Sequence, residues 1–256
     1  MPKKNQKNGQ EFSIFGQSDV GMRCMINSDC IEFDQTKGIA ILTDGMKQSE
    51  AGKISAKLAA KSVFEGLRSD RFTNDLSSSN EEQVLNAMDK LLSKTNQVLI
   101  DASKAVGEGN YMRTTIVAML IRKRKIFLGH VGDSRVYLLR NNILERLTRD
   151  HSLVQDLVFR GVYHQRKQKS SSIDSVTRVL GAKPNIEITT LAHEIKSGDR
   201  LLLCSDGLPD MLSDKEIEKI ANTEIHNLKK TTKNLIKFAN RRGGRDNISV
   251  ILAQIP

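Results

Sequence analysis

Acidic residues stand next to apolar runs at widely separated points in this 256-residue sequence. Asp44-Gly45 and Asp206-Gly207 each follow an apolar run, and Asp246-Asn247 precedes one. Carboxylates at strand ends, beside glycines that let backbones approach closely, suit a hard divalent cation. Because these turns are far apart in the chain, the fold must bring them together. We interpret them as one acidic, metal-binding site.

The residue types also narrow the chemistry of such a site. Carboxylates without neighbouring Cys and with few His favour Mg²⁺ or Mn²⁺ over Zn²⁺. Two cations that share a carboxylate lower the pKa of a water between them and offset charge on a phosphoryl group. A single Asp-Gly turn is explained more simply as a cap or turn, whereas the complete set favours the metal site. Ser134 and Ser205 lack the turn of a serine nucleophile.

Periodicity predicts the elements that must position these residues. Apolar runs and alternation predict strands, and apolar positions spaced by four and three predict helices. The expected strands cover residues 12–17, 31–33, 38–43, 114–121, 126–131, 136–139, 186–191, 200–204 and 248–253, and the expected helices cover 50–67, 84–102, 215–221 and 228–240. Strands and helices come in blocks, not in strict alternation. The order therefore predicts an α+β layered fold with antiparallel sheets.

Composition indicates a soluble globular protein, with 38% apolar and 27% charged residues. No apolar stretch has the length of a membrane span. Residues 1–10 are polar and predict a disordered lead, not a secretory signal. The three cysteines form no CxxC pair, which favours a reducing compartment.

The net charge of +10 leaves two interpretations open. Basic clusters suit an anionic partner such as nucleic acid, an acidic lipid surface or a phosphoprotein, or they are solvated surface. The clusters are scattered and aromatic residues are scarce, which favours solvated surface and disfavours nucleic acid. The clusters lie at residues 122–125, 166–169, 229–230 and 241–242.

Five short motifs, taken in order, carry a resemblance to a known family. They are Asn27–Asp29, Asp44-Gly45, Gly132–Arg135, Ser205–Asp210 and Gly243–Asn247, with Leu147–Ser152 between the third and the fourth. In this order they resemble the metal-dependent serine/threonine protein phosphatases, the type 2C (PPM) family, and most closely its bacterial branch. The resemblance extends from about residue 12 to residue 253. Each motif alone is weak, but the ordered set is specific.

The resemblance implies a role for each acid of the central site. In the family, the aspartate at the position of Asp44 bridges two Mg²⁺ or Mn²⁺ ions, and the carbonyl at the position of Gly45 ligates one of them. Asp206 and Asp246 match the ligands of the other ion. The implied reaction is hydrolysis of phosphoserine or phosphothreonine in proteins by a metal-activated water.

The resemblance also implies outer acids and a fold. Asp29 matches an acid that supports the attacking water, so the implied catalytic set is Asp29, Asp44, Asp206 and Asp246. Asp133 and Asp210 match acids that hold a third, weaker metal in bacterial members. The implied fold is an α-β-β-α sandwich of two antiparallel sheets flanked by helices, with the metals at one end.

Three departures from the family pattern concern the substrate phosphate. The phosphate-binding arginine of the family would fall at Cys24, and the nearest arginine is Arg23. A shift of one residue in extended chain turns a side chain to the other face, unless a bulge intervenes. Lys47 and Gln48 stand where the family has small residues after the Asp-Gly turn, and Arg113 stands where it has a glycine before two threonines. We expect Lys47 or Arg113 to take over part of the phosphate binding.

Two histidines suggest general acids but have simpler interpretations. His130 lies within an apolar strand, which predicts a packed histidine. His151 lies at an expected helix start with Asp150 and Ser152, which predicts a capping role. Protonation of the leaving group then falls to water.

The resulting prediction is a soluble, cytoplasmic bacterial enzyme of signal transduction, a monomer that opposes a serine/threonine kinase. Its partners are phosphorylated proteins, including such a kinase. Residues 11–256 form one phosphatase domain, in which 163–175 is a flap-like mobile segment beside the site. The alternative is a weakened or inactive phosphatase domain that binds phosphoproteins without turning them over.

Overall fold

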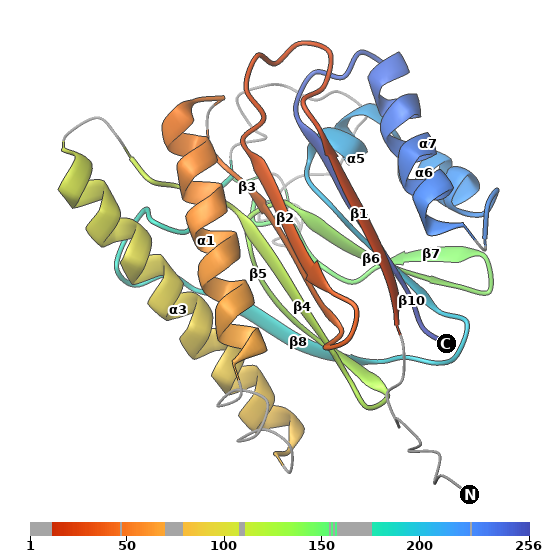
Figure 1. Cartoon of the computed structure of the whole chain (residues 1–256), viewed down its shortest axis with the longest axis horizontal. Helices are drawn as coiled ribbons and strands as arrows, with labels where there is room; N and C mark the ends of the chain where they lie inside the picture. Colours follow the sequence, from red (N-terminus) through yellow and green to blue (C-terminus); the bar gives the residue numbers. More distant parts are fainter. Residues whose placement is uncertain are drawn as a thin grey trace, which may run out of the picture.

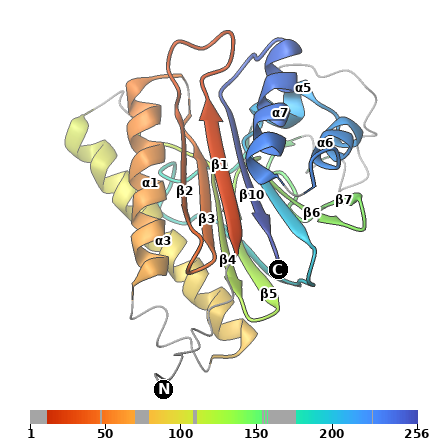
Figure 2. The same cartoon turned by 45° about the vertical axis from the view of Figure 1, so that its right-hand side comes forward.

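The computed structural model describes residues 12–46, 48–69, 79–107, 111–153, 155, 157, 176–225 and 227–256. In this part of the chain, two five-stranded antiparallel sheets pack face to face, with helices on both outer sides (Figures 1 and 2). The predicted α-β-β-α sandwich is confirmed. The predicted lead over residues 1–10 and the flap over 163–175 lie outside the described residues, so both stay predictions.

The first sheet contains the strands that carry Asp29 and Asp44. Every neighbouring pair in this sheet is antiparallel. Its strands, in spatial order, are β2 (Asp29–Asp34), β3 (Ile39–Asp44), β4 (Ile116–Arg122), β5 (Lys125–Val131) and β8 (Thr189–Glu194).

The second sheet contains the strands that lead to Asp206 and away from Asp246. Its neighbouring strands are also antiparallel. In spatial order they are β1 (Ser13–Asp19), β10 (Ile248–Gln254), β9 (Arg200–Cys204), β6 (Arg135–Arg140) and β7 (Ile143–Arg146).

Helices cover the two outer faces. α1 (Glu50–Arg68) and α3 (Glu81–Val106) cover the first sheet, and α5 (Gly207–Met211), α6 (Asp214–Ala221) and α7 (Leu228–Arg241) cover the second (Figure 1). α1 begins where predicted, because the Ser49 hydroxyl accepts a hydrogen bond from the Gly52 N–H. No helix in the described ranges has the length and apolar character that crossing a membrane requires.

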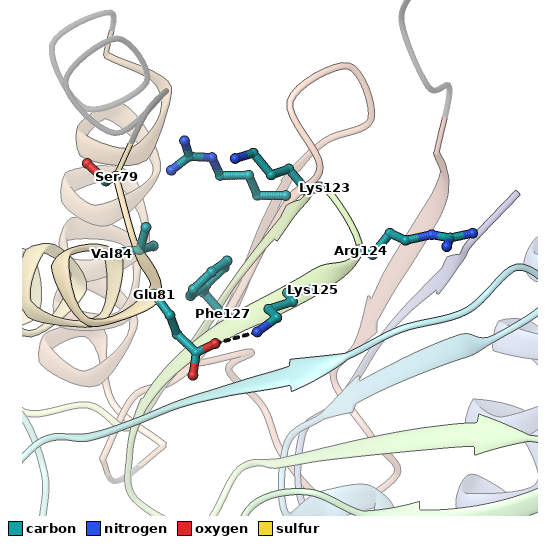
Figure 3. Close-up of a pocket in the computed structure, with 8 residues that line it drawn as sticks. Ser79, Glu81, Val84, Lys123, Arg124, Lys125 and Phe127 are labelled. Carbon is teal, nitrogen blue, oxygen red and sulfur yellow. Dashed lines mark hydrogen bonds and ion pairs between the residues drawn. The ribbon is translucent and has the colours of Figure 1, made fainter.

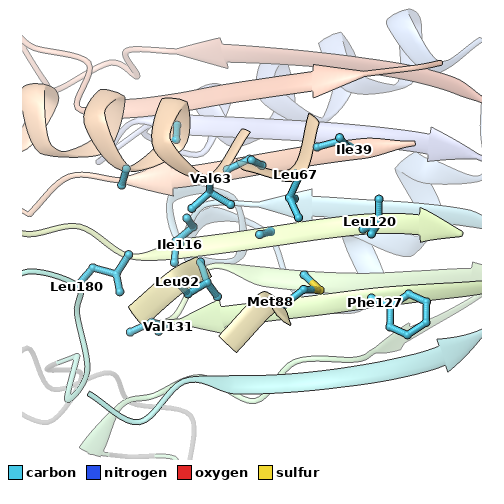
Figure 4. Packing of buried hydrophobic residues seen from close by; sticks show 14 of the residues in the cluster. Ile39, Val63, Leu67, Met88, Leu92, Ile116, Leu120, Phe127, Val131 and Leu180 are labelled. Atoms are coloured by element: carbon cyan, nitrogen blue, oxygen red, sulfur yellow. The ribbon is translucent and has the colours of Figure 1, made fainter. Parts of the chain in front are cut away.

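Side-chain alternation along β4 divides the core into layers. Ile116 and Leu120 point toward α1 and α3, where they join Val63, Leu92 and other apolar residues (Figure 4). Val117, Met119 and Ile121 point the other way and fill the space between the two sheets. A strand that is buried on both faces reads as a continuous apolar run, which is why β4 was recognisable from sequence.

One expected strand was misplaced, and two short elements were not expected. The strand expected over 186–191 begins at Thr189 and ends at Glu194, because its register with β5 pairs Thr189 with His130 and Glu194 with Lys125. β7 and α5 were not predicted, since segments of four and five residues are too short to show a period. The three cysteines are free, as expected.

Candidate metal site

The acidic motifs meet where strand ends of both sheets come together. β3 ends at Asp44, β9 ends two residues before Asp206, and β10 begins two residues after Asp246. The Thr115 N–H donates to the Asp44 carbonyl oxygen at 2.8 Å, and the Ser205 N–H donates to the Ser249 carbonyl oxygen at 3.1 Å. The fold therefore brings together acids that the sequence separates by two hundred residues.

Asp29 lies beside Asp44 because the β2–β3 register pairs the two residues. Its Oδ2 accepts a hydrogen bond from the Ser205 hydroxyl at 2.8 Å, which connects the two sheets. Burial raises the pKa of Asp29 to about 6, and the hydroxyls of Ser249 and Ser205 oppose that rise. Its other oxygen, Oδ1, is buried and has no hydrogen-bond partner in the described part of the chain.

Asp44 and Asp206 form the centre of the cluster. Burial raises the pKa of both carboxyls well above the usual value. Repulsion adds to this rise, from Asp29 at Asp44 and from Asp133 and Asp210 at Asp206. Each carboxyl therefore has its pKa raised by several other carboxylates, which is the electrostatic pattern expected of a cation-binding site.

A second group of acids adjoins Asp206. Asp210 lies one helical turn after Asp206 on α5, where its N–H donates to the Asp206 carbonyl oxygen at 2.9 Å. Burial, together with the charges of Asp150 and Asp210, raises the pKa of Asp133 to about 6. Asp133 and Asp210 thus lie close enough to Asp206 for their charges to raise its pKa, and their predicted role in holding a third metal stays a prediction.

The site fits divalent cations by its chemistry. Asp29 Oδ1 and Asp206 Oδ1 are buried oxygens that no donor satisfies within the described residues. Oxygens of this kind, in a cluster of mutually repelling carboxylates, suit Mg²⁺ or Mn²⁺. In the described ranges no three His, Cys, Asp or Glu side chains already form a closed metal-binding group. Repulsion keeps these carboxylates apart until a cation binds between them.

Two glycines allow the strand ends to approach. A Cβ on Gly45 would lie 2.1 Å from the Gly52 carbonyl oxygen at the start of α1. A Cβ on Gly207 would lie 2.0 Å from the carbonyl oxygen of Asn247. Both clashes are with backbone, which no side-chain rotation relieves. The glycines in the Asp-Gly motifs are therefore needed for close approach.

Asn247 holds the site together, a role that the sequence analysis did not predict. It is 2% exposed and its side chain makes three hydrogen bonds. The Oδ1 accepts from the Ser28 N–H at 2.7 Å, and Nδ2 donates to the carbonyls of Val20 and Ile26 at 2.9 and 3.0 Å. Asn247 thereby fixes the loop between β1 and β2 against the start of β10.

Asn247→Ala is expected to lower the free energy of unfolding by about 3 kcal/mol, because one buried and two part-buried backbone groups lose their partner. Chemical denaturation measures this loss. Asn80→Ala, which removes the exposed cap of α3, provides the scale at about 1 kcal/mol. Equal losses in the two variants would contradict the role assigned to Asn247.

The residues predicted to bind substrate phosphate have different positions. The Cys24 thiol lies 3.7 Å from Asp246 Oδ1, whereas Arg23 is exposed and only its N–H is bonded, to the Gly244 carbonyl oxygen. The carbonyl of Arg113 accepts from the Met46 N–H at 3.0 Å, so Arg113 adjoins the Asp44-Gly45 turn. Lys47 lies outside the described residues.

The two histidines form a stacked pair. Their ring centroids are 4.4 Å apart, and His130 is 1% exposed, as expected for a packed histidine. The prediction that His151 caps a helix was wrong. Its Nδ1 accepts from the Gly132 N–H at 3.1 Å, and its Nε2 lies 3.0 Å from Thr189 Oγ1, so it supports the turn before Asp133.

Of the two neighbours of His151, one caps a helix start and the other forms an ion pair. The Ser152 hydroxyl accepts from the Gln155 N–H at 3.4 Å, which is a capping contact. The Asp150 carboxylate instead accepts hydrogen bonds from Nη2 and Nε of Arg135, at 2.7 and 3.1 Å. The local sequence predicted that Asp150 takes part in the cap, but Asp150 forms an ion pair with Arg135, fifteen residues earlier in the chain.

The buried histidine pair is expected to make the protein acid-labile. Burial, and then the neighbouring His130, lowers the pKa of His151 to about 3, below the ~6.5 of an unfolded chain. Protonation thus favours the unfolded chain, so stability that is complete above pH ~6.5 falls by about 2 kcal/mol on reaching pH ~5. Thermal melts across this range, compared with His151→Asn, measure it. A variant with the same pH dependence as the natural chain would refute the assignment.

Comparisons with known proteins agree with this geometry. A family model described as Protein phosphatase 2C matches residues 23–253. The serine/threonine phosphatase stp of Listeria monocytogenes is 31% identical over 229 residues, which cover 89% of this chain and 88% of that protein. The serine/threonine protein phosphatase PstP of Mycobacterium tuberculosis is 32% identical over 93% of this chain and 44% of that protein.

Solved structures show the same fold. The serine/threonine phosphatase of S. agalactiae superimposes with a TM-score of 0.83 at 28% identity, covering 96% of this chain and 100% of that one. The catalytic domain of PstP in complex with two manganese ions gives a TM-score of 0.75 at 29% identity, covering 95% of this chain and 97% of that one.

A two-sheet sandwich with an acidic site at its strand ends defines a metal-dependent phosphatase fold, and the family match extends over most of the chain. The chain belongs to the protein phosphatase 2C family. The predicted family and the enzyme class, protein-serine/threonine phosphatase, are thereby confirmed.

Proposed function

We propose that the acidic site holds two divalent cations, Mg²⁺ or Mn²⁺, and a third more weakly, and that it hydrolyses phosphoserine and phosphothreonine in proteins. Bound there, the cations would lower the pKa of water and offset charge on the phosphoryl oxygens. The observation that supports this most directly is the pair of buried, unsatisfied oxygens on Asp29 and Asp206 within a cluster of repelling carboxylates.

The proposal gives each acid a role. Asp44, with the carbonyl of Gly45, and the carboxylates of Asp206 and Asp246 hold the two central cations. Asp29 is oriented by the Ser205 hydroxyl and has a pKa of about 6, so it is suited to orient the attacking water and to accept its proton.

The outer acids complete the proposed ligand set. Asp133 and Asp210 would hold the third cation, because both carboxylates act on Asp206. The thermal stability of Asp210→Asn across a Mn²⁺ titration tests this assignment. We expect one weak binding step to disappear while the tighter steps remain.

Arg113 is the proposed ligand of the substrate phosphate, with Lys47 as a second contact and Arg23 as a weaker candidate. The guanidinium of Arg113 lies 4.6 Å from the Tyr111 ring centroid, and its Nε is buried and has no partner among the described residues. Such a group is available to an incoming anion.

Arg113→Ala is expected to raise KM for a phosphopeptide about tenfold, since a charge-assisted hydrogen bond is lost. Steady-state kinetics of Arg113→Ala, Lys47→Ala and Arg23→Ala on one peptide rank the three candidates. An unchanged KM in both Arg113→Ala and Lys47→Ala would remove the proposed phosphate contact.

A turnover assay tests the function itself. Purified protein should hydrolyse a phosphothreonine peptide with Mn²⁺, stop when a chelator is added, and resume when Mn²⁺ is restored. Binding of the peptide without turnover would favour the alternative, a phosphoprotein-binding domain. The observation that motivates this alternative is the Cys24 thiol near Asp246, at the position where the family has an arginine.

The wider setting is also a proposal. We place the chain in the cytoplasm of a bacterium, as a monomer with one phosphatase domain over residues 11–256. Its partners there are phosphorylated proteins of signal transduction, including a serine/threonine kinase.

A further inference from the structure

Four consecutive cations form the turn between β4 and β5. This basic turn, Arg122–Lys125, lies at the opposite end of β4 from Thr115, which bonds to Asp44. Arg122 lies six residues along the strand from Ile116, a distance of about 20 Å. Lys123 has a φ of 55°, a left-handed conformation that a lysine adopts less readily than glycine. The basic turn is thus remote from the acidic site.

The strand register directs two of these cations to one place. Arg122 pairs with Lys125 across the hairpin, and alternation from Leu120 puts Arg122 on the side that faces α3. Like charges directly opposite each other repel. Glu81, in the first turn of α3, bonds to Lys125 with a distance of 2.6 Å between Nζ and Oε2 (Figure 3). The carboxylate of Glu81 therefore pairs with Lys125, and no carboxylate of the described residues pairs with Arg122.

Arg122 is an unsatisfied cation. Its Nη1 and Nη2 atoms are buried, and neither has a hydrogen-bond partner in the part of the chain that the structure describes. Burial also lowers the pKa of Arg122 below its usual value. A covered guanidinium without an acceptor destabilises the fold, so its presence calls for a partner that supplies negative charge.

A cavity of about 290 Å³ adjoins this guanidinium. The basic turn bounds it on one side, and Val84 of α3 and Phe127 of β5 also line it (Figure 3). Its size suits one or two side chains of an extended peptide better than a large ligand. Phe127 is 5% exposed, so the cavity offers no aromatic surface on which a nucleic-acid base could stack.

We propose that this cavity is an exosite for an acidic segment of the protein substrate, in which Arg122 and Lys123 bind carboxylates remote from the phosphorylated residue. The proposal rests on the proposed function for the identity of the substrate. The charge of the basic turn and the missing acceptor at Arg122 together select an anion. A recessed cavity at a hairpin end also differs from the broad amphipathic surface that binds a membrane.

A pair of peptides tests the exosite on the full chain with Mn²⁺. Both carry one phosphothreonine and a Gly-Ser linker of about 16 residues, whose mean span of roughly 22 Å matches the separation. One ends in four glutamates and the other in four glutamines. The glutamate tail should lower KM about tenfold with kcat unchanged. Arg122→Met, which keeps the apolar stem, should abolish that advantage, whereas Lys90→Met, an equal charge change on an exposed part of α3, should keep it.

Stability provides a second readout. Arg122→Met should leave the melting temperature unchanged or raise it, because an unpaired buried cation is replaced by an apolar side chain. A fall of several degrees would show a structural role for Arg122 and would overturn the proposal. Equal KM values for the two tails, or a glutamate advantage that survives Arg122→Met, would also overturn it.

Direct binding separates the exosite from the proposed function. A fluorescent glutamate-tail peptide without phosphothreonine should bind the natural chain and lose affinity in Arg122→Met, even if the acidic site proves inactive. Absence of turnover with this binding intact would refute only the proposed function. Arg122-dependent binding of single-stranded RNA or of phosphatidylserine vesicles, with no binding of the peptide, would replace the acidic protein segment with another partner.

Discussion

Asp206→Asn is expected to lower kcat for phosphopeptide hydrolysis by about a thousandfold or more, since the cations provide several kcal/mol of transition-state stabilisation. The pKa of Asp206 is raised by the charges of four other acids. They are Asp133, Asp210, Asp246 and Asp29. Its Oδ1 is buried and has no partner among the described residues, so the site would lose a metal ligand on substitution by an amide and gain no compensating contact there. Single-turnover and steady-state kinetics with saturating Mn²⁺ measure the loss.

Stability distinguishes loss of a ligand from misfolding in this variant. Without metal, Asp206→Asn should be as stable as the natural chain or more so, because one of several repelling charges is gone. Added Mn²⁺ should then raise its melting temperature less than that of the natural chain. Asp101→Asn, on an exposed part of α3, is the matched control and should keep full activity. Hydrolysis by Asp206→Asn at near the natural rate would refute the assignment.

Gly207→Ala is expected to destabilise the fold by about 3 kcal/mol and to lower kcat as well. The added Cβ would lie 2.0 Å from the Asn247 carbonyl oxygen, so α5 or the start of β10 must move. These two segments carry Asp206 and Asp246, and a displacement of even 1 Å between ligands weakens a metal site. Denaturation and Mn²⁺-dependent kinetics on the same preparation measure both effects.

Gly198→Ala is the matched control for this substitution. Gly198 has a φ of +87°, and a Cβ there meets no atom within 4 Å, so the change tests backbone conformation without a clash. A left-handed alanine costs about 1 kcal/mol. Gly198→Ala should therefore be mildly destabilised and fully active. If Gly207→Ala behaved in the same way, the close approach of the two strand ends would not be needed for activity.

The local pattern was sufficient for most of the fold and for the identity of the acids. Apolar runs predicted the buried strands, and Ser49 and Gly107 marked the start of α1 and the end of α3. These signals are short-range, because period, caps and turns depend on residues within a few positions of one another. β7 and α5 were missed because segments of four and five residues show no period, and the start of β8 was misplaced because its register depends on β5.

The sequence by itself determined which residues are acidic, where they lie along the chain, and that they follow or precede strands. Only the tertiary structure decided what those residues contact. It placed Asp29 beside Asp44, brought Asn247 to the β1–β2 loop, stacked His151 on His130, and gave the Arg122 guanidinium no partner among the residues that the structure describes. The reason is physical: burial and Coulomb interactions act through space, so they arise only when packing brings distant segments together.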